Sequence, residues 1–128
     1  MNRWAEAVCA ICRGFADVAE KEPWGEGART FTVGGRSFAF VRYGGARAGL
    51  SAKPLDGERD AFLALPGVRP APYLGRFGWL ALEVADEEAL ARARVLLGQS
   101  YERFARGRGR RRQRPRTDTA APTGREGR

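Results

Sequence analysis

The regularly spaced apolar residues of this 128-residue chain all lie before residue 105. From Ala105 to Arg128 the chain has nine arginines and two acids, which supply +7 of the total formal charge of +8. A segment with this charge and so few apolar side chains cannot bury enough surface to offset the entropy lost on folding. We therefore expect one nearly neutral α+β domain over residues 1–104 and a disordered, Arg-rich C-terminal tail over residues 105–128.

The first twenty residues have the spacing of an amphipathic helix. Apolar side chains recur there every three or four positions, at Trp4, Val8, Ile11, Phe15 and Val18. This period predicts a helix with one buried stripe from about Asn2 to Glu20, which Pro23 would end.

A pair of glycines predicts a β-hairpin. Gly34 and Gly35 separate two β-prone runs, and a two-residue turn there would set Phe31 opposite Phe38. The register predicts a core face with Phe31, Val33, Phe38 and Phe40, and an opposite face with Thr30, Thr32, Ser37 and Ala39.

A second turn at Gly44–Gly45 predicts a third strand. We favour a three-residue loop with a glycine bulge, because it brings Ala48 and Leu50 onto the core face. A two-residue loop would instead set Gly49 and Ser51 opposite the core phenylalanines.

The next segments predict a short helix and then an edge. Asp56 can cap a helix that runs through Leu65, with Leu55, Phe62 and Leu65 pointing inward. Residues 68–73 are predicted as an extended edge or loop, because the prolines at 70 and 72 cannot donate ladder hydrogen bonds.

A further strand and a last helix complete the domain. Strand alternation from Phe77 to Val84 sets Trp79 on the face opposite the core, and the core face would carry Leu80, Leu82 and Val84. The last helix begins at Asp86 and is expected to end near Gly107. The prediction is an α+β fold: an antiparallel sheet, with a three-strand meander plus one or two further strands, packed by helices on one side.

Three segments together resemble the MmcQ/YjbR family of small bacterial proteins. They are FTVGGRSFAF at residues 31–40, the Lys53–Pro54 step that opens the short helix, and PAPYLGRFGWLALEV at residues 70–84. The resemblance covers residues 4–104 and implies an MmcQ/YjbR-like fold and a DNA-binding function. The Arg-rich extension departs from the family pattern, as does the lack of basic and His residues around PYLGRFGW.

The residue types argue against catalysis. The chain has no His, so the usual general base and the Ser/His and Cys/His nucleophile schemes are absent. Cys9 and Cys12 form a C-x-x-C inside a predicted helix, for which core packing is favoured over a redox pair or a metal shared by a dimer. The acids at helix starts, such as Glu87 and Glu88, are explained by the helix dipole. We expect a non-enzymatic protein without metal or cofactor.

The chain has no run of about 18 apolar residues and no signal-peptide pattern, so we expect a cytoplasmic protein with no membrane contact. Its expected partner is DNA, with RNA or another polyanion as alternatives. The main site is predicted in the tail, where arginines can neutralise phosphates without reading sequence: Arg106, Arg108, Arg110, Arg111, Arg112, Arg114 and Arg116. A solubilising extension with no specific partner is the simpler alternative for this segment.

A second, weaker candidate site lies on the domain itself. If Trp79 faces solvent, a basic surface with stacking rings would combine Arg42, Arg47, Lys53, Tyr73, Arg76 and Trp79. The alternative is that the two rings lie under Pro70–Pro72 and that the arginines pair with acids such as Glu83. The competing function is a protein-interaction adaptor that uses the sheet or a helix groove, with the tail incidental.

Overall fold

The structure is a computed structural model that describes residues 1–22 and 27–113, with side chains described as far as residue 106. The helices are α1 (Arg3–Arg13), α2 (Arg59–Leu63), the short 3-10 helix η1 (Gly75–Phe77) and α3 (Glu87–Gln113). The strands are β1 (Val18–Lys21), β2 (Ala28–Val33), β3 (Arg36–Gly44), β4 (Arg47–Ala52), β5 (Val68–Pro70) and β6 (Leu80–Val84).

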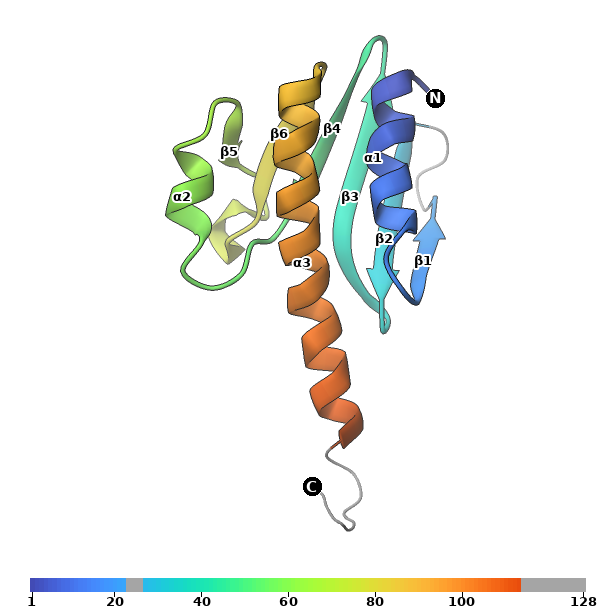
Figure 1. Ribbon diagram of the computed structural model, residues 1–128, viewed down its shortest axis with the longest axis vertical. Helices are drawn as coiled ribbons and strands as arrows, with labels where there is room; N and C mark the ends of the chain where they lie inside the picture. The colour runs from blue at the N-terminus through green and yellow to red at the C-terminus, as the bar shows by residue number, and fades with distance from the viewer. Residues whose placement is uncertain (23–26, 114–128) are drawn as a thin grey trace.

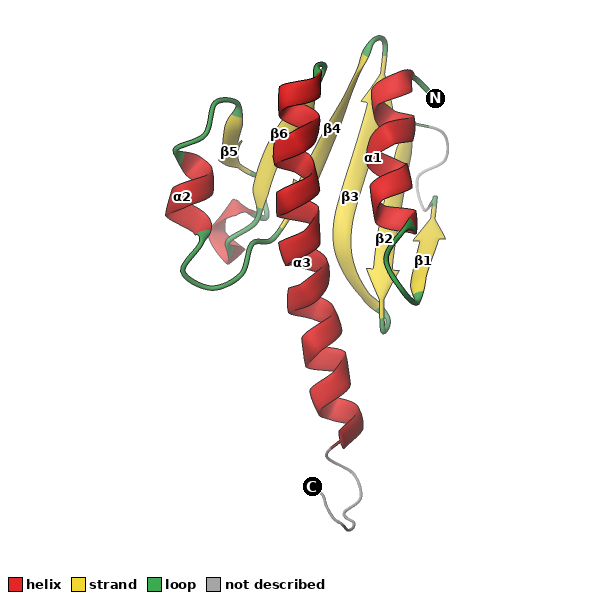
Figure 2. Cartoon of the chain, in the orientation of Figure 1, coloured by secondary structure: helices red, strands yellow, loops and turns green. Residues whose placement is uncertain are grey.

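The six strands form one antiparallel sheet in the order β1-β2-β3-β4-β6-β5. Helices α1 and α3 lie side by side against one face of it (Figures 1 and 2). The core fills the space between this face and the two helices, and its largest fully buried side chains include Phe31, Phe38, Leu80, Leu82, Leu96 and Leu97. The predicted α+β fold is confirmed. We call the opposite face, which neither α1 nor α3 covers, the open face.

The N-terminal helix is shorter than predicted. It begins at the Asn2 cap, whose side chain accepts a hydrogen bond from the amide of Ala5, and it ends at Arg13 instead of Glu20. Gly14 follows, and Asp17 takes a left-handed conformation with φ of 63° that no helix can continue. Val18 then starts β1. The sequence did not reveal this strand, because Val18 continues the helical spacing of apolar residues and fits an edge strand equally well. The predicted stop at Pro23 lies outside the described residues.

The first hairpin contains an unpredicted β-bulge. Thr32 pairs with Ser37, but Phe31 pairs with Ala39, so Phe38 is the extra residue of β3. Since one added residue reverses the alternation beyond it, Ala39 joins the core and Phe40 turns to the open face, which reverses their predicted places. The carbonyl of Phe38 instead accepts a hydrogen bond from the Ser100 hydroxyl at 2.6 Å.

The second turn differs from both predicted versions. Gly44 pairs with Arg47, so the loop has two residues, Gly45 and Ala46, and the pairing beyond it is regular. Gly45 takes φ of 59°, which glycine allows at no cost. Ala48 and Leu50 do lie on the core face, as favoured, because the shift of register had already occurred at Phe38.

The segment after β4 is a shorter helix than predicted. α2 has Glu58 at its N-cap without a side-chain hydrogen bond, and Asp56 binds Arg103 instead of capping. Leu65 is exposed, whereas Phe62 is buried as predicted. Residues 68–70 form the edge strand β5, which agrees with the edge that the prolines predicted.

The last helix is longer than predicted. Asp86 caps it, with its carboxylate accepting from the amide of Ala89 at 2.8 Å. Phe104 is the last buried residue among those with described side chains, but α3 continues past Gly107 to Gln113. No break in the helix marks the predicted boundary between residues 104 and 105. Once packed turns have nucleated a helix, each further residue adds a hydrogen bond, and arginine is a good helix former. Figure 1 shows this end of α3 projecting beyond the sheet.

Candidate nucleic-acid interface

The first five of the arginines predicted as the main site lie on the projecting end of α3. Arg106, Arg108, Arg110, Arg111 and Arg112 occupy helical positions, and Arg114 and Arg116 lie outside the described residues. Arg106 forms an ion pair with Glu102, one turn earlier. We call residues 106–113 the basic end of α3.

Two cations of the domain lie where α3 leaves the sheet. The guanidinium of Arg36 lies 4.9 Å from the centre of the Phe104 ring. Lys53 is the second cation: burial first, and then the charge of Arg103, lower its pKa, with Asp56 acting in the opposite direction and Arg36 adding a smaller lowering. Arg103 is neutralised by Asp56 at 2.8 Å, whereas neither Arg36 nor Lys53 has an ion pair within the described part of the chain.

The weaker predicted site is divided by the structure. Lys53 belongs to the region around Arg36, and Arg76 lies on η1 with its guanidinium 4.8 Å from the Phe77 ring. Trp79 is only 8% exposed, and its ring lies between Phe40 at 5.4 Å and Phe104 at 5.9 Å. The condition for this site, a tryptophan that faces solvent, is therefore not met, and the Trp79 ring cannot stack on a base in this conformation.

The remaining three residues of that set, Arg42, Arg47 and Tyr73, do meet on the open face. They line a hollow of about 560 Å³ over β3, β4 and β6. Arg47 pairs with Glu83 at 2.7 Å, as the simpler alternative expected. Arg69 of β5 also lines the hollow and was missed, because only the pairing of Arg69 with Ala81 places it on this face.

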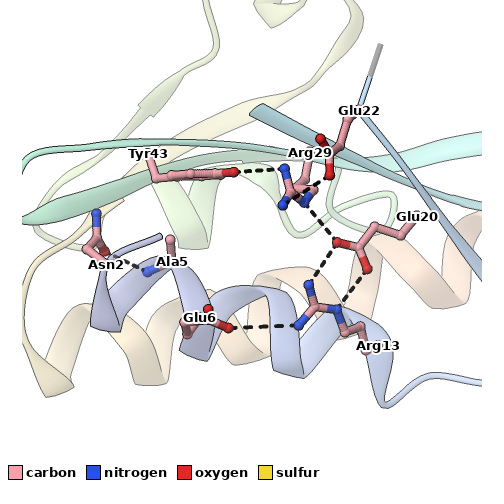
Figure 3. A network of polar contacts seen from close by, with 8 residues as sticks. All are labelled: Asn2, Ala5, Glu6, Arg13, Glu20, Glu22, Arg29 and Tyr43. Atoms are coloured by element: carbon pink, nitrogen blue, oxygen red, sulfur yellow. Dashed lines mark hydrogen bonds and ion pairs between the residues drawn. The ribbon is translucent and has the colours of Figure 1, made fainter. Parts of the chain in front are cut away.

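The best-connected polar cluster joins secondary structure elements. Glu20 of β1 accepts two hydrogen bonds from Arg13, both 2.8 Å, and one of 3.0 Å from Arg29 of β2 (Figure 3). Arg29 also donates to the Tyr43 hydroxyl at 2.7 Å and pairs with Glu22 at 3.1 Å. The hydrogen bonds from Arg13 are the main reason that the pKa of Glu20 is lowered. Since its members satisfy one another, this cluster holds α1, β1 and β2 together.

Cys9 and Cys12 are fully buried in the core. Burial raises the pKa of Cys9 to about 11 and raises that of Cys12 as well, so both remain thiols at neutral pH. The structure therefore agrees with the packing role. No group of three or more potential metal ligands occurs among the described side chains. In the same residues, no helix is both long enough and apolar enough to cross a bilayer.

Comparison with known proteins finds no matching family model and no matching curated protein. The solved structures that match this chain include the following two, which share its fold. A Pseudomonas syringae protein is 14% identical with a TM-score of 0.60, over 81% of this chain and 99% of its own. The Deinococcus radiodurans protein DR2400, which has a DUF419 domain, is 21% identical with a TM-score of 0.62, over 83% of this chain and 88% of its own. DUF419 is the MmcQ/YjbR-like fold, so the chain resembles that fold in structure as well as in its motifs.

Proposed function

We propose that this protein is a non-enzymatic nucleic-acid-binding protein that attaches to phosphates mainly through the basic end of α3. The observation that supports this proposal is the continuation of α3 for nine residues beyond Phe104. Five arginines, at 106, 108, 110, 111 and 112, are thereby placed on a helix that extends away from the sheet. Arg114 and Arg116 follow in the sequence and add to the same charge.

The binding is electrostatic. Each arginine that neutralises a phosphate releases condensed counterions, and this term does not depend on base sequence. Contacts to phosphates fix the position of a protein on DNA and carry no sequence information, which favours attachment over the reading of one site. DNA is the proposed partner.

The domain contributes at the base of the helix. Arg36 and Lys53 are free of ion pairs in the described part of the chain, and they continue the cationic surface from α3 onto the sheet. The nearby acids Asp56 and Glu102 are already paired with Arg103 and Arg106. This region therefore adds two positive charges without adding an unpaired negative one.

Two matched variants test the proposal by fluorescence anisotropy of a labelled DNA duplex. The first replaces the five arginines of the basic end by glutamine, and the second replaces them by lysine. We expect the glutamine variant to lose binding and the lysine variant to retain most of it, because only charge is required. Equal binding by the glutamine variant and the natural chain would move the site elsewhere.

A control substitution, Arg94→Gln, removes an exposed charge from an earlier turn of α3. It should bind as the natural chain does. If binding responded to net charge alone, Arg94→Gln should lose about one fifth of what the five-fold glutamine variant loses on a logarithmic scale, and such a loss would count against a special role for the basic end.

A further inference from the structure

The hollow on the open face has a floor of small residues. Phe40 pairs with Ser51, and Ser51 pairs with Ala81. In the next row, Arg42 pairs with Gly49, and Gly49 pairs with Glu83. At Gly49, Ser51 and Ala81 the two middle strands, β4 and β6, thus present only small side chains, and the larger Glu83 at one end of this floor pairs with Arg47.

Two cations without an ion pair among the described residues lie on opposite sides of this floor. Arg42 lies on β3 and Arg69 on β5, which are three strands apart, or roughly 14 Å at the usual strand spacing. Both are exposed, and neither has an ion pair with any described residue. Since Arg47 and Glu83 neutralise each other, the hollow has a net positive charge.

Tyr73 lies on the β5 side of the hollow, and its backbone has a strained conformation. Its φ is 64°, and the amide of Leu74 donates to the carbonyl of Pro72 at 2.6 Å, which closes a γ-turn of the rare, strained hand around the tyrosine. The residue is 93% exposed, so folding gains almost nothing from burial of the ring. Glycine would adopt this backbone at lower cost. Strain kept at an exposed aromatic residue beside a hollow is typical of a ligand clamp.

We propose that this hollow binds a nucleoside phosphate. Arg42 binds the phosphate on the β3 side of the hollow. Tyr73 stacks on the base on the β5 side, where Arg69 supplies the second cation. The small floor lets a flat ring approach the sheet, and the volume of about 560 Å³ lies within the usual range for small-molecule sites. The site is on the face of the sheet opposite α3, and its argument does not rest on the basic end of α3. The nucleotide can be a free mononucleotide or one unit of a single strand.

The test is a titration of the ¹⁵N-labelled full chain with AMP, followed by NMR. We expect saturable shifts of the amide signals of Gly49, Ser51 and Ala81. Adenosine alone and inorganic phosphate alone should each bind at least about tenfold more weakly, because each lacks one of the two contacts. The absence of shifts at these three amides at millimolar AMP would overturn the proposal, as would shifts confined to α3.

The source of the nucleotide is read from a second titration, with a five-nucleotide single strand. Tighter binding than AMP with the same three amides shifted assigns the hollow to a strand, and equal or weaker binding assigns it to free nucleotides. Both results support the proposed chemistry, whereas a strand that shifts only the basic end of α3, with AMP silent, contradicts it.

Substitutions distinguish a loss of AMP binding from a loss of stability. Tyr73→Gly should weaken AMP binding about tenfold, as expected for loss of one stacked ring, while the melting temperature stays the same or rises. Arg42→Ala and Arg69→Ala should each weaken it by a similar factor. The matched control Arg94→Ala, on α3, should have no effect. Unchanged AMP affinity in Tyr73→Gly would refute the stacking role.

Discussion

Removal of the Ser100 hydroxyl should destabilise the protein by about 2–4 kcal/mol, a large effect for one oxygen atom. Ser100 is fully buried on α3. Its hydroxyl donates to the Phe38 carbonyl at 2.6 Å and accepts from the Lys53 amide at 3.0 Å. It thus joins α3 to the bulge of β3 and to the end of β4. Ser100→Ala leaves both backbone groups without this partner.

The magnitude follows from the burial of each group. A buried polar group left unsatisfied costs about 1–3 kcal/mol, and the bond to the Phe38 carbonyl is fully buried. The bond to the Lys53 amide is partly buried, so water can replace some of it and about 1 kcal/mol is added. The total is a sizeable share of the 5–15 kcal/mol by which domains are usually stable.

The assay is equilibrium unfolding in urea, which gives the free energy of unfolding of each variant. The control is Ser51→Ala on the open face, where the same atom is removed from a side chain that has no hydrogen bond with the described residues; it should change stability by at most about 0.5 kcal/mol. A change as small as this for Ser100→Ala would refute the reasoning and show that the bulge is held by other contacts.

Three further predictions concern charge and burial. Because the pKa of Glu20 is lowered in the folded protein, its contribution to stability is present above the unfolded pKa and is lost as pH falls through the lower folded value. The free energy of unfolding should therefore fall more steeply with decreasing pH in the natural chain than in Glu20→Gln. Equal slopes would count against the cluster. Cys9 and Cys12 should react with a thiol reagent only as fast as the protein unfolds, and rapid labelling under native conditions would contradict their burial. The basic end of α3 has two glycines, at 107 and 109, and like charges four residues apart, so DNA should slow hydrogen exchange at residues 107–113, and unchanged exchange would argue against binding there.

The sequence predicted the elements of the fold better than their registers. Hydrophobic period and the Asp86 cap correctly predicted the existence of the meander, the start of the last helix and the core face of β6, whereas β1 and the continuation of α3 to Gln113 were missed. The bulge at Phe38 could not be foreseen, because Phe and Ala at 38–40 fit either face and the partner of the Phe38 carbonyl, Ser100, lies 62 residues away in the sequence. The end of α1 was missed for a related reason, since Val18 satisfies both a helical stripe and an edge strand.

The candidate sites could be predicted only where the local sequence determines the positions of their residues. The concentration of arginines beyond residue 105 is visible in the composition, but the continuation of α3 depends on the packed turns before it. Arg69 and Tyr73 acquire their places from the pairing of β5 with β6 and from a strained turn. Trp79 was misplaced because Phe104, from a distant helix, covers the end of the sheet.

The most direct test of the account is the salt dependence of DNA binding by the full chain, compared with the five-fold glutamine variant of the basic end. If five arginines each neutralise one phosphate, the logarithm of the binding constant should fall against the logarithm of salt concentration with a slope near −4 to −5. The glutamine variant should show weak binding and a much shallower slope, because only the remaining cations, Arg36, Lys53, Arg114 and Arg116, can still contact phosphates. An equally steep slope in both proteins would contradict the account and assign the phosphate contacts to another part of the molecule.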